Sequence, residues 1–297
     1  MQSDWEWTIR YFGWIHEDYM RFVRDLLTFL TLSNSKDLDE RISSKLLTTN
    51  NGLKIELKNV SYSYPNTKFK VLQDINFTIY PGEKIALIGE NGSGKSTLVK
   101  LISGLLEPSD GEIRINGQII TSKSPLHKIS VVFQDFSEYH MSVRENVGLG
   151  EPVKIDDINY IFKAIKKGGA MDFIEPLEEG INTMLGATFG GQDISGGQWQ
   201  RIATSRGFMP QAHLFILDEP TAALDAIAEE KIYERFQEMA GDQTAILISH
   251  RIGFASLADK IIVLNKGEIV EYGTHEDLLN HNGEYSRFLA LQSEWYR

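Results

Sequence analysis

The stretch that decides the fold runs from residue 85 to residue 97 and reads IALIGENGSGKST. Its first four residues form a short apolar run, which is typical of a strand buried on both faces. The rest fits the pattern G-x-x-x-x-G-K-[S/T]. Glycines let the backbone curl so that successive N–H groups point at phosphate oxygens, and a helix that begins there adds partial positive charge. The stretch therefore predicts a phosphate-binding loop between a buried strand and a helix from Thr97 to Ser103.

We expect this loop to bind the phosphates of a nucleotide. The Lys95 ammonium would reach the β- and γ-phosphates, and the Ser96 hydroxyl would bind Mg²⁺. The predicted nucleotide-binding residues of the loop are Gly89, Glu90, Asn91, Gly92, Ser93, Gly94, Lys95, Ser96 and Thr97. The loop indicates a nucleotide but not the use to which the nucleotide is put.

Two carboxylates, Asp218 and Glu219, follow the apolar run Leu214–Leu217. Open α/β sheets bind ligands at the carboxyl ends of their strands, so we expect both side chains to face the phosphates. Asp218 would hold Mg²⁺ through water. Glu219 would lie beyond the γ-phosphate, where a carboxylate that accepts a proton from the attacking water contributes about 10²- to 10⁴-fold in rate. Glu219 is therefore the candidate general base.

Three further side chains stand at the ends of predicted strands and are weaker signals. His250 follows the run 245–249, and its imidazole would orient water or Glu219. Gln134 ends the run 131–133, and its amide oxygen would bind Mg²⁺. Tyr64 precedes Pro65, and its ring would stack on adenine.

The remaining sequence predicts a mixed α/β fold. Alternating residues over 53–57, with further strands over 61–64 and 71–79, indicate an antiparallel layer. Helices separate several of the buried apolar runs, which indicates a parallel sheet with crossover helices. These runs are 85–88, 130–133, 214–217, 245–248 and 261–264.

Two regions lie outside this regular alternation of strands and helices. The segment 135–212 is mostly helix and loop, so it predicts a helical subdomain inserted into the sheet. At the other end, a hairpin strand over 268–271 precedes a closing helix with Thr274 as its N-cap.

Residues 1–50 predict an amphipathic helix and a polar linker, and residues 51–297 the main domain. Apolar residues recur every three or four positions between Trp5 and Leu30, the period of one helical face. Charged residues interrupt this stretch, so no run approaches the ~20 apolar residues that span a bilayer. The apolar face of the helix belongs either against its own domain or against a partner.

Composition excludes several classes of protein. The chain has 297 residues and 30 Lys and Arg against 41 Asp and Glu, a net charge of −11, so no overall positive field draws it to nucleic acid. It has no cysteine, which excludes disulfides, thiolate metal sites and cysteine nucleophiles and fits a reducing cytosol. The near-average composition excludes global disorder.

A second glycine motif lies at residues 194–203, which read ISGGQWQRIA. A serine and a glycine pair open a helix there, and bare N–H groups at a helix N-terminus form an anion site. One chain thus has one phosphate-binding loop but two phosphate-binding surfaces. We expect Ser195, Gly196, Gly197 and Gln198 to close on a nucleotide held by another copy, in a head-to-tail dimer with two ATP molecules at the interface.

Together these motifs resemble the nucleotide-binding domain of ATP-binding cassette (ABC) transporters over about residues 53–292. The resemblance implies a P-loop NTPase fold, with an ABC-type ATPase core that contains the antiparallel layer and the inserted helical subdomain. It makes Tyr64 the adenine-stacking residue, Gln134 the Q-loop, Ser195–Gln198 the signature, Asp225 the D-loop aspartate and His250 the switch histidine.

The resemblance also implies ATP and Mg²⁺ as cofactors. ATP would be hydrolysed with Lys95, Glu219 and His250 as catalytic residues, and the metal would be held by Ser96, Gln134 and Asp218. The partners would be a second nucleotide-binding domain, in a homodimer or heterodimer, and a transmembrane domain. The chain itself would lie peripherally at the cytoplasmic face of the cell membrane, or otherwise in the cytoplasm.

Details of the sequence resemble bacterial peptide or lantibiotic exporters, notably Phe189-Gly190-Gly191 and Gln198-Trp199-Gln200, and this resemblance implies export of a peptide or hydrophobic substrate. The N-terminal helix is similar to the cytoplasmic end of an exporter's last transmembrane helix. The sequence departs from the family at Ile194, where leucine is usual, and at Phe189-Gly190, where many exporters carry Glu-Arg. With no spanning segment in the sequence, we expect the transmembrane domain on a separate or missing chain.

Two other classes of ATP-using protein are less consistent with the sequence. A soluble ATPase that acts on nucleic acid or ribosomes conflicts with the single cassette and the negative charge. A small-molecule kinase leaves the motif at 195–198 and Glu219 unexplained.

Overall fold

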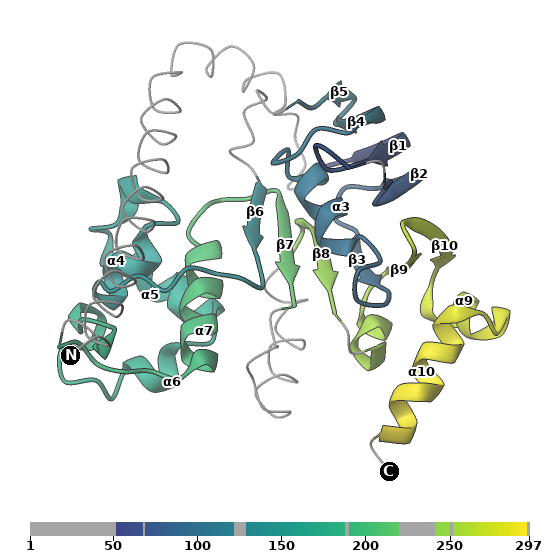
Figure 1. The fold of residues 1–297 in the computed structure, drawn as a ribbon. Helices are drawn as coiled ribbons and strands as arrows, with labels where there is room; N and C mark the ends of the chain where they lie inside the picture. Colours follow the sequence, from purple (N-terminus) through teal and green to yellow (C-terminus); the bar gives the residue numbers. More distant parts are fainter. Residues whose placement is uncertain are drawn as a thin grey trace, which may run out of the picture. The chain divides into compact units, whose positions relative to one another are not determined.

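The computed structural model describes residues 52–67, 69–121, 129–187, 190–219, 241–249 and 252–295. The predicted amphipathic helix and linker of residues 1–50, Phe189, Asp225 and His250 lie outside these residues. The described part contains a four-stranded sheet, a six-stranded sheet and a group of helices (Figure 1). Among the described residues, no helix is long and apolar enough to cross a bilayer.

The four-stranded sheet is antiparallel and confirms the predicted antiparallel layer. Its strand order is β2-β1-β4-β5. The strands are β1 (Ile55–Tyr62), β2 (Leu72–Ile79), β4 (Asp110–Ile115) and β5 (Gln118–Ile119). Ile55, Val60, Leu72 and Ile79 are buried in its core.

The prediction of two separate strands over 53–57 and 61–64 is wrong, because the single strand β1 runs from Ile55 to Tyr62 and includes part of each stretch. The register of β1 against β2 shifts between Leu57 and Val60, and Asn59 there has a φ of 50°. Such a bulge interrupts the side-chain alternation without ending the strand. The sequence pattern therefore looked like two strands.

The six-stranded sheet has the order β10-β9-β3-β8-β7-β6. Its strands are β3 (Lys84–Ile88), β6 (Ile129–Val132), β7 (Leu214–Asp218), β8 (Thr244–Ile248), β9 (Lys260–Asn265) and β10 (Glu268–Gly273). Five of them are parallel, and β10 pairs antiparallel with β9. All five predicted apolar runs and the hairpin strand are confirmed. Every residue of β7 and β8 is buried, as expected for central strands.

The helices confirm the predicted helical subdomain between the strands β6 and β7. It contains α4 (Val143–Gly148), the 3₁₀ turns η1 (Pro152–Lys154) and η2 (Gly180–Asn182), α5 (Ile158–Lys167), α6 (Met171–Ile174) and α7 (Gly196–Gly207). Ile161, Ile165, Trp199 and Ile202 pack in one apolar cluster there.

The other helices cover the six-stranded sheet. The helix α3 (Lys95–Ile102) follows β3, and the turn η4 (Ile252–Leu257) and the helices α9 (His275–His281) and α10 (Glu284–Trp295) lie near the C-terminus. Tyr285 of α10 is buried against residues of β3 and β9. The predicted N-cap is confirmed, because the Thr274 side chain accepts a hydrogen bond from the Asp277 N–H.

Two glycines of the antiparallel layer have the same backbone conformation in different surroundings. Gly111 and Gly117 both have a φ of 81°. A Cβ at Gly111 would lie 2.2 Å from the Asn59 carbonyl oxygen, whereas a Cβ at Gly117 would meet nothing within 4 Å. The bulge in β1 thus depends on the missing side chain at position 111.

We predict that Gly111→Ala lowers the free energy of unfolding more than Gly117→Ala. Both variants carry the strain of a left-handed alanine, about 1–2 kcal/mol. Gly111→Ala adds the displacement of the β1 backbone, about 1–3 kcal/mol more by analogy with overpacked sites. Urea denaturation of the two variants measures the difference, and equal losses would contradict the close approach described here.

Candidate nucleotide-binding site

The predicted phosphate-binding loop lies between β3 and α3, as expected. Gly94, in the left-handed region with a φ of 106°, is the N-cap of α3, which begins at Lys95. A Cβ at Gly89 would lie 2.1 Å from the Leu264 carbonyl oxygen of β9, so this position has no room for a side chain. The loop is thus held close against the neighbouring strand, with the N-terminus of α3 at its end.

Lys95 folds back over this loop. Its Nζ donates hydrogen bonds to the carbonyl oxygens of Gly89, at 2.9 Å, and Glu90, at 3.1 Å. The side chain is buried, and burial lowers the pKa of Lys95, while the negative charges of Glu219 and Asp218 act in the opposite direction. A phosphate oxygen would replace the two carbonyls with a charged acceptor, which forms a stronger hydrogen bond.

The same loop contains a polar group without a partner. The Ser93 Oγ is buried and forms no hydrogen bond. A buried hydroxyl without a partner costs about 1–3 kcal/mol, so such a group indicates a missing ligand or water.

The two predicted carboxylates lie at the carboxyl end of β7. Asp218 is the last residue of the strand, and Glu219 follows with a φ of 50° and an N–H that donates to the Ile248 carbonyl at 3.1 Å. Burial raises the pKa of Asp218, and a hydrogen bond with Ser96 and the charge of Lys95 act against this rise. The structure therefore brings Lys95, Ser96, Asp218 and Glu219 together.

The donor atoms of this cluster fit Mg²⁺. Asp218 Oδ1 is buried and has no hydrogen-bond partner, so one carboxylate oxygen is available. The Ser96 hydroxyl lies beside it, as the hydrogen bond to Asp218 shows. Mg²⁺ prefers oxygen ligands and is usually bound by one or two carboxylates plus substrate phosphates. In the part of the chain that the structure describes, no three acidic or histidine side chains form a metal site by themselves.

The two weaker predictions within the described residues have different degrees of support. The Tyr64 hydroxyl shares a hydrogen bond of 3.2 Å with Thr97 Oγ1, so its ring lies beside α3, and 39% of the residue is exposed. Gln134 is exposed and follows β6, the strand next to β7. The charge of its neighbour Asp135 helps to raise the pKa of Asp218, which indicates that this segment lies near the carboxylates.

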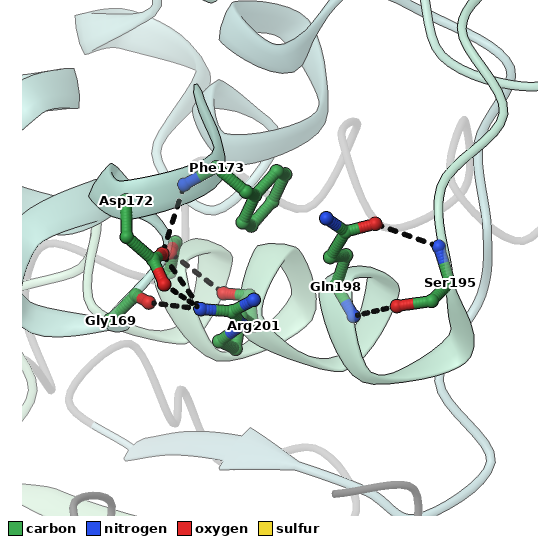
Figure 2. A network of polar contacts seen from close by, with 7 residues as sticks. Gly169, Asp172, Phe173, Ser195, Gln198 and Arg201 are labelled. Atoms are coloured by element: carbon green, nitrogen blue, oxygen red, sulfur yellow. Dashed lines mark hydrogen bonds and ion pairs between the residues drawn. The ribbon is translucent and has the colours of Figure 1, made fainter. Parts of the chain in front are cut away.

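The second glycine motif forms the N-terminus of α7, as predicted. Ser195 and Gln198 form a capping box, in which Ser195 Oγ accepts from the Gln198 N–H at 3.3 Å and Gln198 Oε1 accepts from the Ser195 N–H at 2.8 Å (Figure 2). The N–H groups of Gly196 and Gly197 belong to the first helical turn and have no acceptor within the helix. Among the described residues, no hydrogen bond or ion pair joins 195–198 to the loop 89–97.

The sequence did not reveal the roles of two residues of α7: one holds the backbone of the candidate base, and the other joins α7 to residues 169–173. Gln200 Nε2 donates to the Glu219 carbonyl at 3.1 Å, so it fixes the backbone of the candidate base. Arg201 Nη1 donates to the Asp172 carboxylate at 2.7 Å and to the Gly169 carbonyl at 3.0 Å (Figure 2). Its guanidinium carbon lies 4.8 Å from the centre of the Phe173 ring. Both residues fall inside the quoted motif, but only the packing of α7 reveals their partners.

Comparison with known proteins identifies relatives of the chain. The family model described as ABC transporter matches residues 72–222. The subtilin transport ATP-binding protein of Bacillus subtilis is 43% identical over 230 residues, which cover 76% of this chain and 37% of that protein. The nisin transport ATP-binding protein of Lactococcus lactis subsp. lactis is 37% identical over 266 residues, which cover 87% of this chain and 43% of that protein.

Two further similarities agree with these. The leukotoxin translocation ATP-binding protein of Mannheimia glucosida is 41% identical over 243 residues, which cover 80% of this chain and 34% of that protein. The solved structure of a bacterial Atm1-family ABC exporter with ATP bound superposes with a TM-score of 0.74 at 29% identity, covering 82% of this chain and 42% of that one. The chain thus spans between 34% and 43% of the length of these curated relatives.

We predict that Asp218→Asn does not destabilise the ligand-free protein at neutral pH. The folded-state pKa of Asp218 is raised, so the folded state binds more protons than the unfolded state between the ordinary Asp pKa and the raised value. The free energy of unfolding therefore falls as the pH rises through this window. Asparagine does not titrate, so Asp218→Asn removes this loss of stability.

Urea denaturation between about pH 4 and pH 7 measures this effect. Asp277→Asn is the control of opposite sign, because hydrogen bonds from Thr274 lower the pKa of Asp277. A loss of stability in Asp218→Asn at pH 7 that exceeds its loss at pH 4 would contradict the assignment.

Proposed function

The chain belongs to the ABC transporter family, and from this premise we propose that it is the ATP-binding and ATP-hydrolysing part of an exporter. The observation that carries the proposal is the convergence of Lys95, Ser96, Asp218 and Glu219 from the carboxyl ends of β3 and β7. Two of the relatives named above are the ATP-binding proteins of subtilin transport and of nisin transport. Together with the resemblance to peptide and lantibiotic exporters, they support a peptide or hydrophobic molecule as the substrate class that we propose.

Each residue of the site has its own role in the binding and hydrolysis of ATP. The loop 89–97 binds the phosphates through its backbone N–H groups and through Lys95, and Tyr64 stacks on the adenine. Ser96, Asp218 and Gln134 would hold Mg²⁺, which would neutralise phosphate charge. Glu219 accepts a proton from the attacking water. Gln200, which holds the Glu219 carbonyl, fixes the position of this base.

The site is completed by a second copy or a related domain. Ser195, Gly196, Gly197 and Gln198 present exposed or half-buried backbone at the start of α7. They have no hydrogen bond to the loop 89–97 within the described residues, which supports their action on the nucleotide of a partner. We assign Asp225 and His250 to the same interface and catalytic site on the family resemblance, since both lie outside the described residues.

The coupling partner is a transmembrane domain, which this chain contacts at the cytoplasmic face of the membrane. Four apolar residues on the segment that follows Gln134 are exposed: Tyr139, Met141, Leu149 and Val153. This segment continues along the chain from the predicted Mg²⁺ ligand Gln134, so we assign it to the contact with the transmembrane domain. On the family resemblance, we assign residues 1–50 as the remnant or equivalent of the extension of an exporter's last transmembrane helix, and residues 51–297 as the ATPase domain.

We predict that Glu219→Gln retains ATP binding, reduces turnover by about 10²- to 10⁴-fold and accumulates an ATP-bound dimer. The amide cannot accept the proton of the attacking water, so the closed dimer does not reopen. Steady-state hydrolysis and size-exclusion chromatography with light scattering in the presence of ATP measure the two effects. Glu268→Gln, at an exposed position on β10, is the matched control. An ATP-bound monomer of Glu219→Gln would contradict the proposed dimer.

A further inference from the structure

A second cavity lies at the opposite end of the central strands from the candidate nucleotide site. It has a volume of about 260 Å³. One wall comes from α5, and the other comes from the connection between α7 and β7 and from Gln243, which precedes β8. The cavity therefore borders the amino ends of β7 and β8, whereas Asp218 and Glu219 lie at the carboxyl end. The five residues of β7 separate the two sites by roughly 16 Å.

The wall from α5 is a basic and aromatic stripe. Tyr160, Lys163, Ala164 and Lys167 line the cavity at the spacing of one helical face. Lys154 lies outside this wall, with its Nζ 3.8 Å from the centre of the Tyr160 ring. Lys163 is exposed at the rim of the cavity, and Lys167 is half-buried.

Lys163 and Lys167 form no ion pair with an acidic side chain in the part of the chain that the structure describes. No acidic side chain lines the cavity, and no ion pair within the described residues includes Lys163 or Lys167. Lys167 is half-buried, and its Nζ lies 5.7 Å from the centre of the Phe208 ring. Burial, and then the charge of Lys163, lower the pKa of Lys167. Two cations held together without an anion are unfavourable, and a bound anion would relieve this repulsion.

We propose that this cavity binds a small phosphate-bearing ligand, with its phosphate between Lys163 and Lys167 and its remaining atoms against Phe208 and Tyr160. Lysine binds phosphate as a point charge, and aromatic rings provide a flat apolar wall for a planar group. The volume of about 260 Å³ lies just below the range of pockets for drug-sized ligands, so the ligand is compact. The site is separate from the ATP site, and a ligand in it would bridge α5 and the connection that leaves α7.

Pyridoxal 5′-phosphate is a suitable probe, because it combines a phosphate, a planar ring and an aldehyde. A neutral lysine amine adds to the aldehyde, water leaves, and the resulting imine is reduced by borohydride to a stable secondary amine. The full chain is labelled with ATP present, and mass spectrometry maps each labelled lysine. Lys166, exposed on the same helix and outside the cavity, is the internal control.

We expect Lys167 to be labelled at least about tenfold more than Lys166, because the cavity concentrates the phosphate beside an amine of lowered pKa. Inorganic phosphate should protect Lys167 and leave Lys166 unchanged. Lys163→Gln should remove both the preference for Lys167 and the protection. Equal labelling of Lys166 and Lys167, or protection that persists in Lys163→Gln, would overturn the proposal.

The source of the phosphate is found by varying the protecting agent. Protection by glycerol 3-phosphate but not by vesicles that contain phosphatidic acid identifies a soluble ligand, and the reverse result identifies a lipid headgroup. Both results support a phosphate site. Protection by neither agent, nor by inorganic phosphate, would refute it.

Discussion

The interaction on which the rest of the site depends is the charge coupling between the buried Lys95, which follows β3, and the two carboxylates Asp218 and Glu219 at the end of β7. The strand order places β8 between β3 and β7, so the loop after β3 and the carboxylates after β7 lie on either side of the carboxyl end of β8. Lys95 is buried and is charge-coupled to both Asp218 and Glu219. Burial opposes the charged form of both Lys95 and Asp218. Burial therefore makes the charges of Lys95 and Asp218 costly, and a bound phosphate beside Lys95 and a divalent cation beside Asp218 would stabilise them.

Much of this fold could be predicted from the sequence because its signals are local. Buried strands appear as short apolar runs, and the phosphate-binding loop and the Thr274 cap depend on a few neighbouring residues. The failures arose where a strand or a partner depends on distant contacts. The bulge at Asn59 made one strand look like two. The β4–β5 hairpin is a different kind of failure, because its signal is local: Asn116 and Gly117, both with positive φ, form a typical hairpin turn that was not predicted.

The supporting residues of the site show the same limit. Gln200 and Arg201 lie inside the motif at 194–203. Gln200 bonds to Glu219, 19 residues away, and Arg201 bonds to Asp172, 29 residues away. Nothing in the local pattern names Glu219 or Asp172 as those partners. The roles of Asp225 and His250, and the boundary near residue 50, remain predictions from the sequence.

The central claim is that each ATP site is shared between two chains, and mixing two inactive variants tests it most directly. Lys95→Ala removes the phosphate-binding lysine and keeps the signature, whereas Gly197→Asp places a negative charge in the signature and keeps the lysine. In a head-to-tail dimer of one chain of each kind, one site is complete. An equal mixture should therefore recover hydrolysis up to about a quarter of the unmodified rate, since half of the dimers form with one intact site each. Hydrolysis by the Gly197→Asp protein alone at the unmodified rate, or no recovery on mixing, would contradict the account.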